Sequence, residues 1–114
     1  MPLKKLSLKS VHFGDVWICS GQSNMQFSMG GQAEWDVGGV FNSEEEIANI
    51  ANYPNIKMFK IKMMTASEPQ DDLMDYDFKT WISSNDKENI KVFSAVCLLT
   101  IRYMADVLGK NKVR

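Results

Sequence analysis

An uninterrupted apolar run near the N-terminus is followed at once by small polar residues. The run "VWIC" (residues 16–19) consists of residues that favour strands, and Ser20 and Gly21 end it. A short continuous apolar run bounded by turn residues is typical of a strand buried on both faces, as in a parallel sheet. We therefore predict a strand over residues 15–19 that leads into a tight turn.

Residues 42–52 carry the signature of a helix start. Ser43 precedes Glu46 by three residues, the spacing of a capping box, and an acidic triplet faces the positive end of the helix dipole. We predict a helix over this stretch. Capping explains the triplet Glu44, Glu45 and Glu46 better than metal binding does.

Alternation of apolar residues with lysines predicts a second strand over residues 56–63. Phe59, Ile61 and Met63 share one face, and Lys60 and Lys62 lie on the other. Lysines are typical of a sheet edge, so we expect a half-exposed strand. The acidic stretch at residues 66–77 lacks the glycine and glutamate spacing of a calcium loop, and we predict a solvated loop. Its acidic residues are Asp71, Asp72, Asp75 and Asp77.

The longest periodic stretch predicts a helix over residues 89–108, with Gly109 as its C-terminal cap. The face expected to meet the core carries Phe93, Val96, Cys97, Thr100, Met104 and Val107. The order strand, turn, helix, strand, loop, helix is typical of a doubly wound α/β sheet. We therefore predict an α/β fold with a partial, incomplete sheet, in which residues 15–19 and 56–63 are neighbouring parallel strands with the C-terminal helix on one face.

Length and charge narrow the functional classes. The chain has 114 residues, 45% of them hydrophobic, which suits one small domain over residues 1–114. Its net charge of −1 offers no basic stripe, so nucleic acid is not an expected partner. The longest apolar stretch, residues 92–101, is about half of the roughly 20 residues that cross a bilayer, so no membrane span is expected. No signal peptide is visible, because the N-terminal lysines precede no apolar run of about 7–15 residues.

Two cysteines are too few for a disulfide scaffold. Cys19 and Cys97 each lie within an apolar segment, where a buried free thiol is the common state. We predict two buried thiols.

Ser23 follows the first predicted strand, at the sheet edge where ligands bind in α/β folds. A hydroxyl becomes a nucleophile when a base removes its proton and N–H donors stabilise the oxyanion. Gly21 permits close backbone approach, and the amide of Ser23 is a possible donor. The stretch is not a Gly-x-Ser-x-Gly elbow, because Met25 replaces the second glycine. The pattern alone leaves a nucleophile and a helix cap open.

The one histidine is poorly placed to act as the base. His12 precedes the predicted strand and Ser23 follows it, so a strand of about five residues separates them by on the order of 16 Å. A general base must come within about 3 Å of the hydroxyl or act through one water. Asp15, at the strand entrance, fails for the same reason.

Two longer stretches resemble a known family. "VHFGDVWICSGQSNMQF" (residues 11–27) resembles the nucleophile block of the sialate O-acetylesterase family, which belongs to the SGNH hydrolases, and "FSAVCLLTIRYMADVLG" (residues 93–109) is similar to the helix before that family's second block. The resemblance implies an SGNH/flavodoxin-like sheet, with Ser23 as the catalytic nucleophile. It implies removal of O-acetyl groups from sialic acid or a related acetylated carbohydrate through an acetyl-enzyme, with no cofactor or metal. It also implies a lysosomal or extracellular location.

The same resemblance predicts that this chain is a fragment. The family's glycine block, its oxyanion-hole side chain and its Asp–His pair would all lie beyond Arg114. We expect an N-terminal part of the catalytic domain that is inactive alone. Two alternatives remain: a non-catalytic module that binds sugar or a partner chain, and an unrelated small α/β domain in which Ser23 is a cap.

Overall fold

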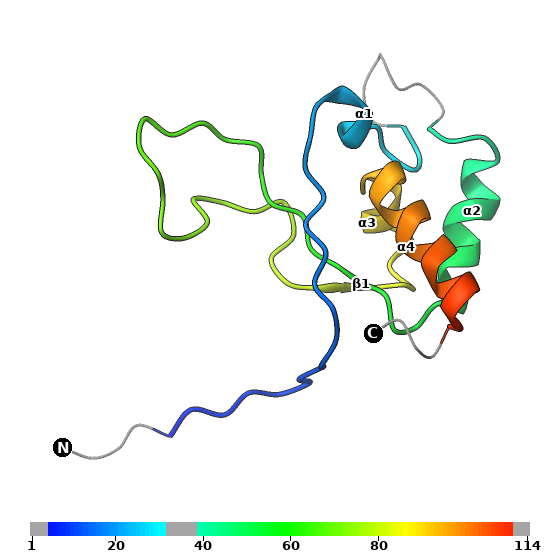
Figure 1. Ribbon diagram of the computed structural model, residues 1–114, viewed down its shortest axis with the longest axis horizontal. Helices are drawn as coiled ribbons and strands as arrows, with labels where there is room; N and C mark the ends of the chain where they lie inside the picture. Colours follow the sequence, from blue (N-terminus) through cyan, green and yellow to red (C-terminus); the bar gives the residue numbers. More distant parts are fainter. Residues whose placement is uncertain (1–4, 32–38, 111–114) are drawn as a thin grey trace.

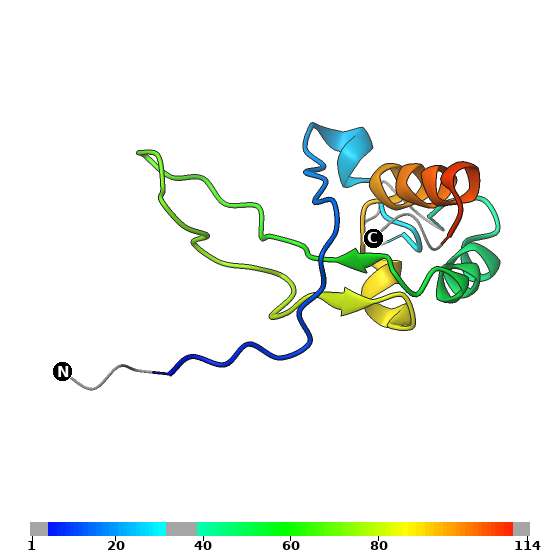
Figure 2. The ribbon, with the colours of Figure 1, turned by 60° about the horizontal axis from the view of Figure 1, so that its bottom comes forward.

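Short helices and one small sheet make up the fold in a computed structural model, which describes residues 5–31 and 39–110. In chain order the elements are α1 (Ser23–Gln26), α2 (Ser43–Asn49), the 3-10 helix η2 (Ile50–Asn52), β1 (Lys57–Met58), β2 (Ile82–Ser83), α3 (Lys87–Lys91) and α4 (Ala95–Leu108). The helices gather at one end of the molecule, and the long connection between β1 and β2 projects from the other (Figures 1 and 2).

The sheet is antiparallel, so the predicted parallel doubly wound sheet is wrong. β1 pairs with β2 in the register Lys57↔Ser83 and Met58↔Ile82. An isolated antiparallel bridge joins Ile61 to Tyr76 further along the same connection. The mixture of helices and strands is compatible with the α/β class, but the strand that pairs with β1 comes from later in the chain than the sequence pattern indicated.

The predicted strand over residues 15–19 is also wrong. The whole N-terminal segment, residues 5–21, has no helix or strand, and every residue in it is exposed. Trp17 is 55% exposed and Ile18 is 91% exposed. An apolar run becomes a buried strand only when neighbouring strands pair with it and helices cover both faces. β1 pairs with β2 instead, so the segment remains an extended chain that crosses the sheet and leads away from the helices (Figures 1 and 2).

The predicted strand over residues 56–63 is present only as the two-residue β1. The face that is buried is the one opposite to the predicted apolar face. Ile56 and Met58 are buried, whereas Ile61 and Met63 are exposed. Lys60 lies on the buried side, where its ammonium donates to a carbonyl between α3 and α4 at 3.0 Å. A lysine can occupy such a position because its long apolar stem packs while its charged end reaches a polar partner.

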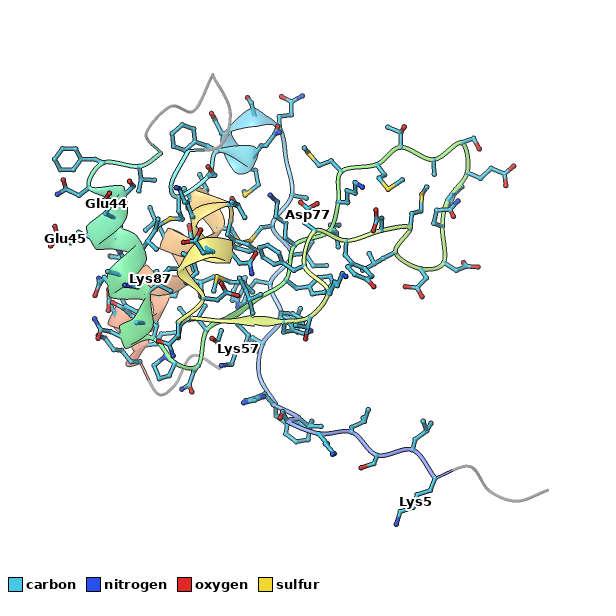
Figure 3. All side chains as sticks on the ribbon, turned by 180° about the vertical axis from the view of Figure 1, so that it is seen from behind. Lys5, Glu44, Glu45, Lys57, Asp77 and Lys87 are labelled. Atoms are coloured by element: carbon cyan, nitrogen blue, oxygen red, sulfur yellow. A yellow bond between two sulfur atoms is a disulfide. The ribbon has the colours of Figure 1, made fainter. Side chains whose placement is uncertain are left out.

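The stretch 66–77 is a loop, as predicted. Two ion pairs join its end to the residues that follow β1: Lys62 Nζ lies 2.9 Å from Asp75 Oδ2, and Lys60 Nζ lies 3.4 Å from Asp77 Oδ2. Figure 3 shows Asp77 near the base of the projecting connection. The hydrogen bond from Lys62 lowers the pKa of the Asp75 carboxyl. The two arms of the connection are thus held together by charge and by the Ile61 bridge.

The helix predicted over residues 42–52 is confirmed as α2 followed by η2, but its predicted cap is wrong. Asn42, not Ser43, is the N-cap, with a left-handed φ of 53° and no side-chain cap hydrogen bond. Glu46 pairs with the guanidinium of Arg102 on α4 instead of reaching back to the helix start. Figure 3 shows the other two glutamates of the triplet pointing outward. The acidic first turn still favours this helix through its dipole.

The helix predicted over residues 89–108 is broken into α3 and α4. Asp86 caps α3 by accepting from the Asn89 amide at 3.2 Å, and Ser94 caps α4 by accepting from the Cys97 amide at 3.3 Å. The end of α4 agrees with the prediction, because Gly109 follows it with φ 99°, a conformation that favours glycine.

The core-facing side of α4 is shifted from the predicted one, although Cys97 is buried as predicted. Ala95, Leu98 and Ala105 are buried, whereas Val96, Thr100 and Val107 are exposed. Adjacent stripes of α4 are both apolar, so periodicity did not separate them. The stripe that packs is the one facing the core formed with α2, η2, α3 and β1. The other core residues are Met29, Ile47, Ile50, Tyr53, Ile56, Met58, Phe78, Ile82 and Ile90.

Cys19 and Cys97 form a disulfide, so the prediction of two free thiols is wrong. Their Cα atoms are 5.8 Å apart across a sequence separation of 78 residues. Composition gave no sign of the pairing, because it depends on the fold bringing the N-terminal segment against α4. Closing a loop of this length restricts the unfolded chain and contributes about 4 kcal/mol to stability in the chain-entropy account.

Stability is expected to fall at high pH because of Tyr53. This buried phenol donates to Asp106 Oδ1 at 2.6 Å. The hydrogen bond, burial and the nearby negative charge raise the pKa of Tyr53 from its ordinary value of 10.0 to about 12. The folded chain therefore holds this proton more tightly than the unfolded chain. Its stabilising effect is complete below about pH 10 and is lost as the pH rises towards about 12.

Urea unfolding across this pH range tests the prediction. Tyr53→Phe should be less stable than the parent below about pH 10 and should lose less stability above it, because it has no phenol to ionise. Tyr103→Phe, at an exposed position on α4, is the matched control and should follow the parent. Equal losses in Tyr53→Phe and the parent would contradict the prediction.

Candidate active site

Ser23 is the first residue of α1 and does not cap it. The N-cap position belongs to Gln22, and no side-chain hydrogen bond caps this helix. Gly21 turns the chain from the extended N-terminal segment into α1 with φ +151°, a backbone conformation that residues other than glycine rarely adopt. The Ser23 hydroxyl is therefore exposed at the start of a short helix, directly after a glycine-dependent turn.

The chain after α1 is fixed to the start of α4 by backbone hydrogen bonds. The carbonyl of Phe27 accepts from the amide of Ala95 at 2.8 Å. The amides of Met29 and Gly30 donate to carbonyls of residues 91–93 at 3.0 and 2.8 Å. These carbonyls and the Ala95 amide are available because the helix breaks between α3 and α4. The break therefore gives the Ser23 region its support.

Ser94 connects both sides of the candidate site. Its hydroxyl donates to Met25 Sδ at 3.3 Å and accepts from the Cys97 amide at 3.3 Å. Cys97 in turn carries the disulfide to Cys19. Ser23 lies four residues after Cys19 and four before the Phe27 carbonyl, so the first turn of α4 holds the chain on either side of it. Sequence reasoning missed this support, although the spacing of Ser94 and Cys97 is that of a helix cap.

No base contacts Ser23 in the described part of the chain. Among the described residues, the Ser23 hydroxyl forms no hydrogen bond with an imidazole or a carboxylate. His12 lies in the exposed N-terminal segment, with Nδ1 2.9 Å from the carbonyl of Ser10. Asp15 lines a cavity near β1. The arrangement thus supplies a serine position without a local partner to deprotonate it.

A cavity of about 90 Å³ lies between the N-terminal segment, β1 and α4. Asp15 and Trp17 line it from the segment, residues 55–59 from the β1 side, and Cys97 and Leu98 from α4, with further apolar residues of the core. Ser23 does not line this cavity. This cavity is a packing gap beside Cys97, where the N-terminal segment lies over the helical core without a strand partner.

Among residues 5–31 and 39–110, no three or more His, Cys, Asp or Glu side chains form a group that could hold a metal ion. Within the same residues, no helix has both the length and the apolar character required to span a membrane.

Comparison with known proteins identifies the relatives of this chain. The sialate O-acetylesterase of Mus musculus is 36% identical over 106 residues, and that of Homo sapiens is 36% identical over 108 residues. Each match covers 90% of this chain. Over the matched residues, the chain is similar to sialate O-acetylesterases. This confirms the family resemblance of residues 11–27 and 93–109. No family model and no solved structure matches the chain.

The chain spans 18% of the length of the mouse sialate O-acetylesterase and 19% of the human one. The matched region includes the stretches that the structure brings together, the turn into α1 and the first turn of α4.

Proposed function

We propose that this chain forms part of the catalytic domain of a serine esterase that removes O-acetyl groups from sialic acids, with Ser23 as the nucleophile. The observation that carries the proposal is the position of Ser23, exposed at the first residue of α1 within a segment held on both sides by α4. A nucleophile needs both exposure to substrate and a fixed position. The family of the matched relatives supports the substrate class.

In the proposed reaction, the Ser23 hydroxyl attacks the carbonyl carbon of the acetyl ester as a base takes its proton. The backbone amide of Ser23 is one donor toward the resulting oxyanion. Collapse of the tetrahedral intermediate releases the sugar hydroxyl and leaves an acetyl-enzyme, which water then hydrolyses to acetate. The one histidine of the sequence, His12, bonds to the Ser10 carbonyl and not to Ser23, so we propose that an imidazole base comes from outside these 114 residues. The isolated chain should then be essentially inactive.

A chimera tests this function. In it, the present chain replaces the matched segment of the mouse sialate O-acetylesterase. We expect acetate release from an O-acetylated sialic acid but none from a sialic acid that bears only an N-acetyl group, while the isolated chain stays near background. A second chimera that receives only residues 14–27 controls for misfolding of the larger replacement. A folded second chimera that releases no acetate, beside an active mouse parent, would contradict the proposal.

The exposed N-terminal segment favours a second candidate, a non-catalytic module that binds a partner chain. Val16, Trp17 and Ile18 are exposed in succession on an extended backbone. Extended apolar segments of this kind pair with strands of other chains. This candidate predicts that both chimeras lack Ser23-dependent activity, and the same assay therefore separates the two.

A further inference from the structure

Apart from the continuing backbone, one covalent bond attaches the N-terminal segment to the rest of the fold. Residues 5–21 are all exposed, and no backbone hydrogen bond joins them to another part of the described chain. Figure 3 shows Lys5 at the far end of this segment, away from the helices. Asp15 and Trp17 contribute packing around the small cavity. The Cys19–Cys97 disulfide is the bond that holds the segment against α4.

The two cysteines of this disulfide differ in exposure. Cys19 is an exposed residue of the N-terminal segment, whereas Cys97 is 9% exposed. Exchange begins when a thiolate attacks one sulfur, so accessibility directs the attack to Cys19. Cys97 lies in the first turn of a 14-residue helix, where the positive end of the dipole stabilises a departing thiolate. Both features favour attack at Cys19 with Cys97 as the leaving group.

We propose that Cys19–Cys97 is a thiol-exchange site that a dithiol reductant opens at Cys19, and that opening it releases the N-terminal segment and loosens α1. One thiolate of the dithiol attacks Cys19 Sγ, the bond between the sulfurs breaks, and its electron pair leaves on Cys97, which takes up a proton. The second thiolate of the dithiol then attacks the mixed disulfide. Cys19 leaves as a thiolate and is protonated, and the reagent closes its own disulfide, so two electrons pass to the protein.

Release of the N-terminal segment loosens α1 because the disulfide is one of the two attachments that hold this part of the chain. The amides of Met25 and Gln26 bond to the carbonyl of Gln22, and the amide of Phe27 bonds to the carbonyl of Ser23. After reduction only the contacts with the start of α4 remain, on the far side of Ser23. The conformational effect stands without the proposed catalytic role. Its consequence, an esterase whose nucleophile is ordered only in the oxidised chain, rests on the proposed function.

The test uses the 114-residue chain and reads no activity, so its outcome is separate from that of the chimera assay. A limiting amount of glutathione, followed by peptide mapping, should place the trapped mixed disulfide on Cys19. Reduction with dithiothreitol should then speed hydrogen exchange of the α1 amides about tenfold more than that of the α2 amides, since the lost loop closure affects both helices but local opening affects only the released unit. Cys19→Ser should reproduce this pattern without a reductant.

Three results would overturn the proposal. The first is a glutathione adduct on Cys97 rather than on Cys19. The second is equal exchange of the α1 amides in the oxidised and reduced chains. The third is an equal rise in exchange across α1 and α2, which would make the disulfide a staple for the whole fold instead of a tether for one segment.

Discussion

In the chimera that carries the whole present chain, Ser23→Ala is expected to lower kcat for acetate release by about 10⁴-fold or more, because the nucleophile and its base act as a unit in serine hydrolases. The substitution removes only an exposed hydroxyl that does not cap α1, so folding should be unaffected. KM should change far less than kcat, since the lost bond forms only during the chemical step. Steady-state kinetics with an O-acetylated sialic acid measures both constants.

Ser7→Ala is the matched control for this experiment. Ser7 is another exposed serine of the N-terminal segment, and its loss should leave kcat and KM unchanged. Thermal unfolding of both variants verifies that neither change alters the fold. An active Ser23→Ala chimera would assign the reaction to another residue, and Ser23 would then be only the start of a helix.

Leu98→Ala is expected to lower the free energy of unfolding by about 2–5 kcal/mol. Leu98 is 1% exposed and belongs to the core that joins α4 to the sheet and the other helices. It also lines the 90 Å³ cavity, so removing its side chain enlarges a space that already exists. Larger cavities cost more, which places this variant toward the upper part of the range. Small domains have a free energy of unfolding of only about 5–15 kcal/mol, so this loss would be a large part of the stability of the fold.

Val107→Ala provides the comparison on the same helix. Val107 is exposed, and alanine favours helices slightly more than valine does, so the free energy of unfolding should change by less than about 0.5 kcal/mol. Urea unfolding of the parent and the two variants gives the midpoints and slopes needed. Similar losses at both positions would show that the packed face of α4 has been assigned to the wrong stripe.

Local signals in the sequence predicted local structure well. The acidic first turn predicted α2, and Gly109 predicted the end of α4. The loop at residues 66–77 was also correct. Each of these features depends on interactions within a few residues, such as dipoles, caps and turns, which a single sequence contains in full.

Contacts between residues far apart in the sequence were not predictable from local signals. The apolar run at residues 16–19 has the composition of a buried strand, but burial depends on other strands that pair with it, and β1 pairs with β2. Cys19 and Cys97 have the apolar neighbours of free thiols, but the fold places them together. In both cases the sequence specifies what a residue favours, and the tertiary structure decides which partner it meets.

The candidate site combines a local feature that the sequence indicated with long-range contacts that it did not. Ser23 was identified by the pattern of residues around it, a turn glycine after an apolar run, and by the resemblance of that block to a family. Its support by Ser94 and by the disulfide was not predicted, because those contacts join residues 69 and 78 positions apart in the sequence. The start of α4 therefore belongs to the site as much as the serine block does.

Covalent labelling of the chimera tests the central claim, that Ser23 is the nucleophile, most directly. A fluorophosphonate transfers its phosphonyl group to an activated serine, which raises the protein mass by one adduct and blocks acetate release. Peptide mapping should then place the adduct on Ser23, and Ser23→Ala should prevent labelling. An inhibited chimera whose single adduct maps to any other residue would contradict the account.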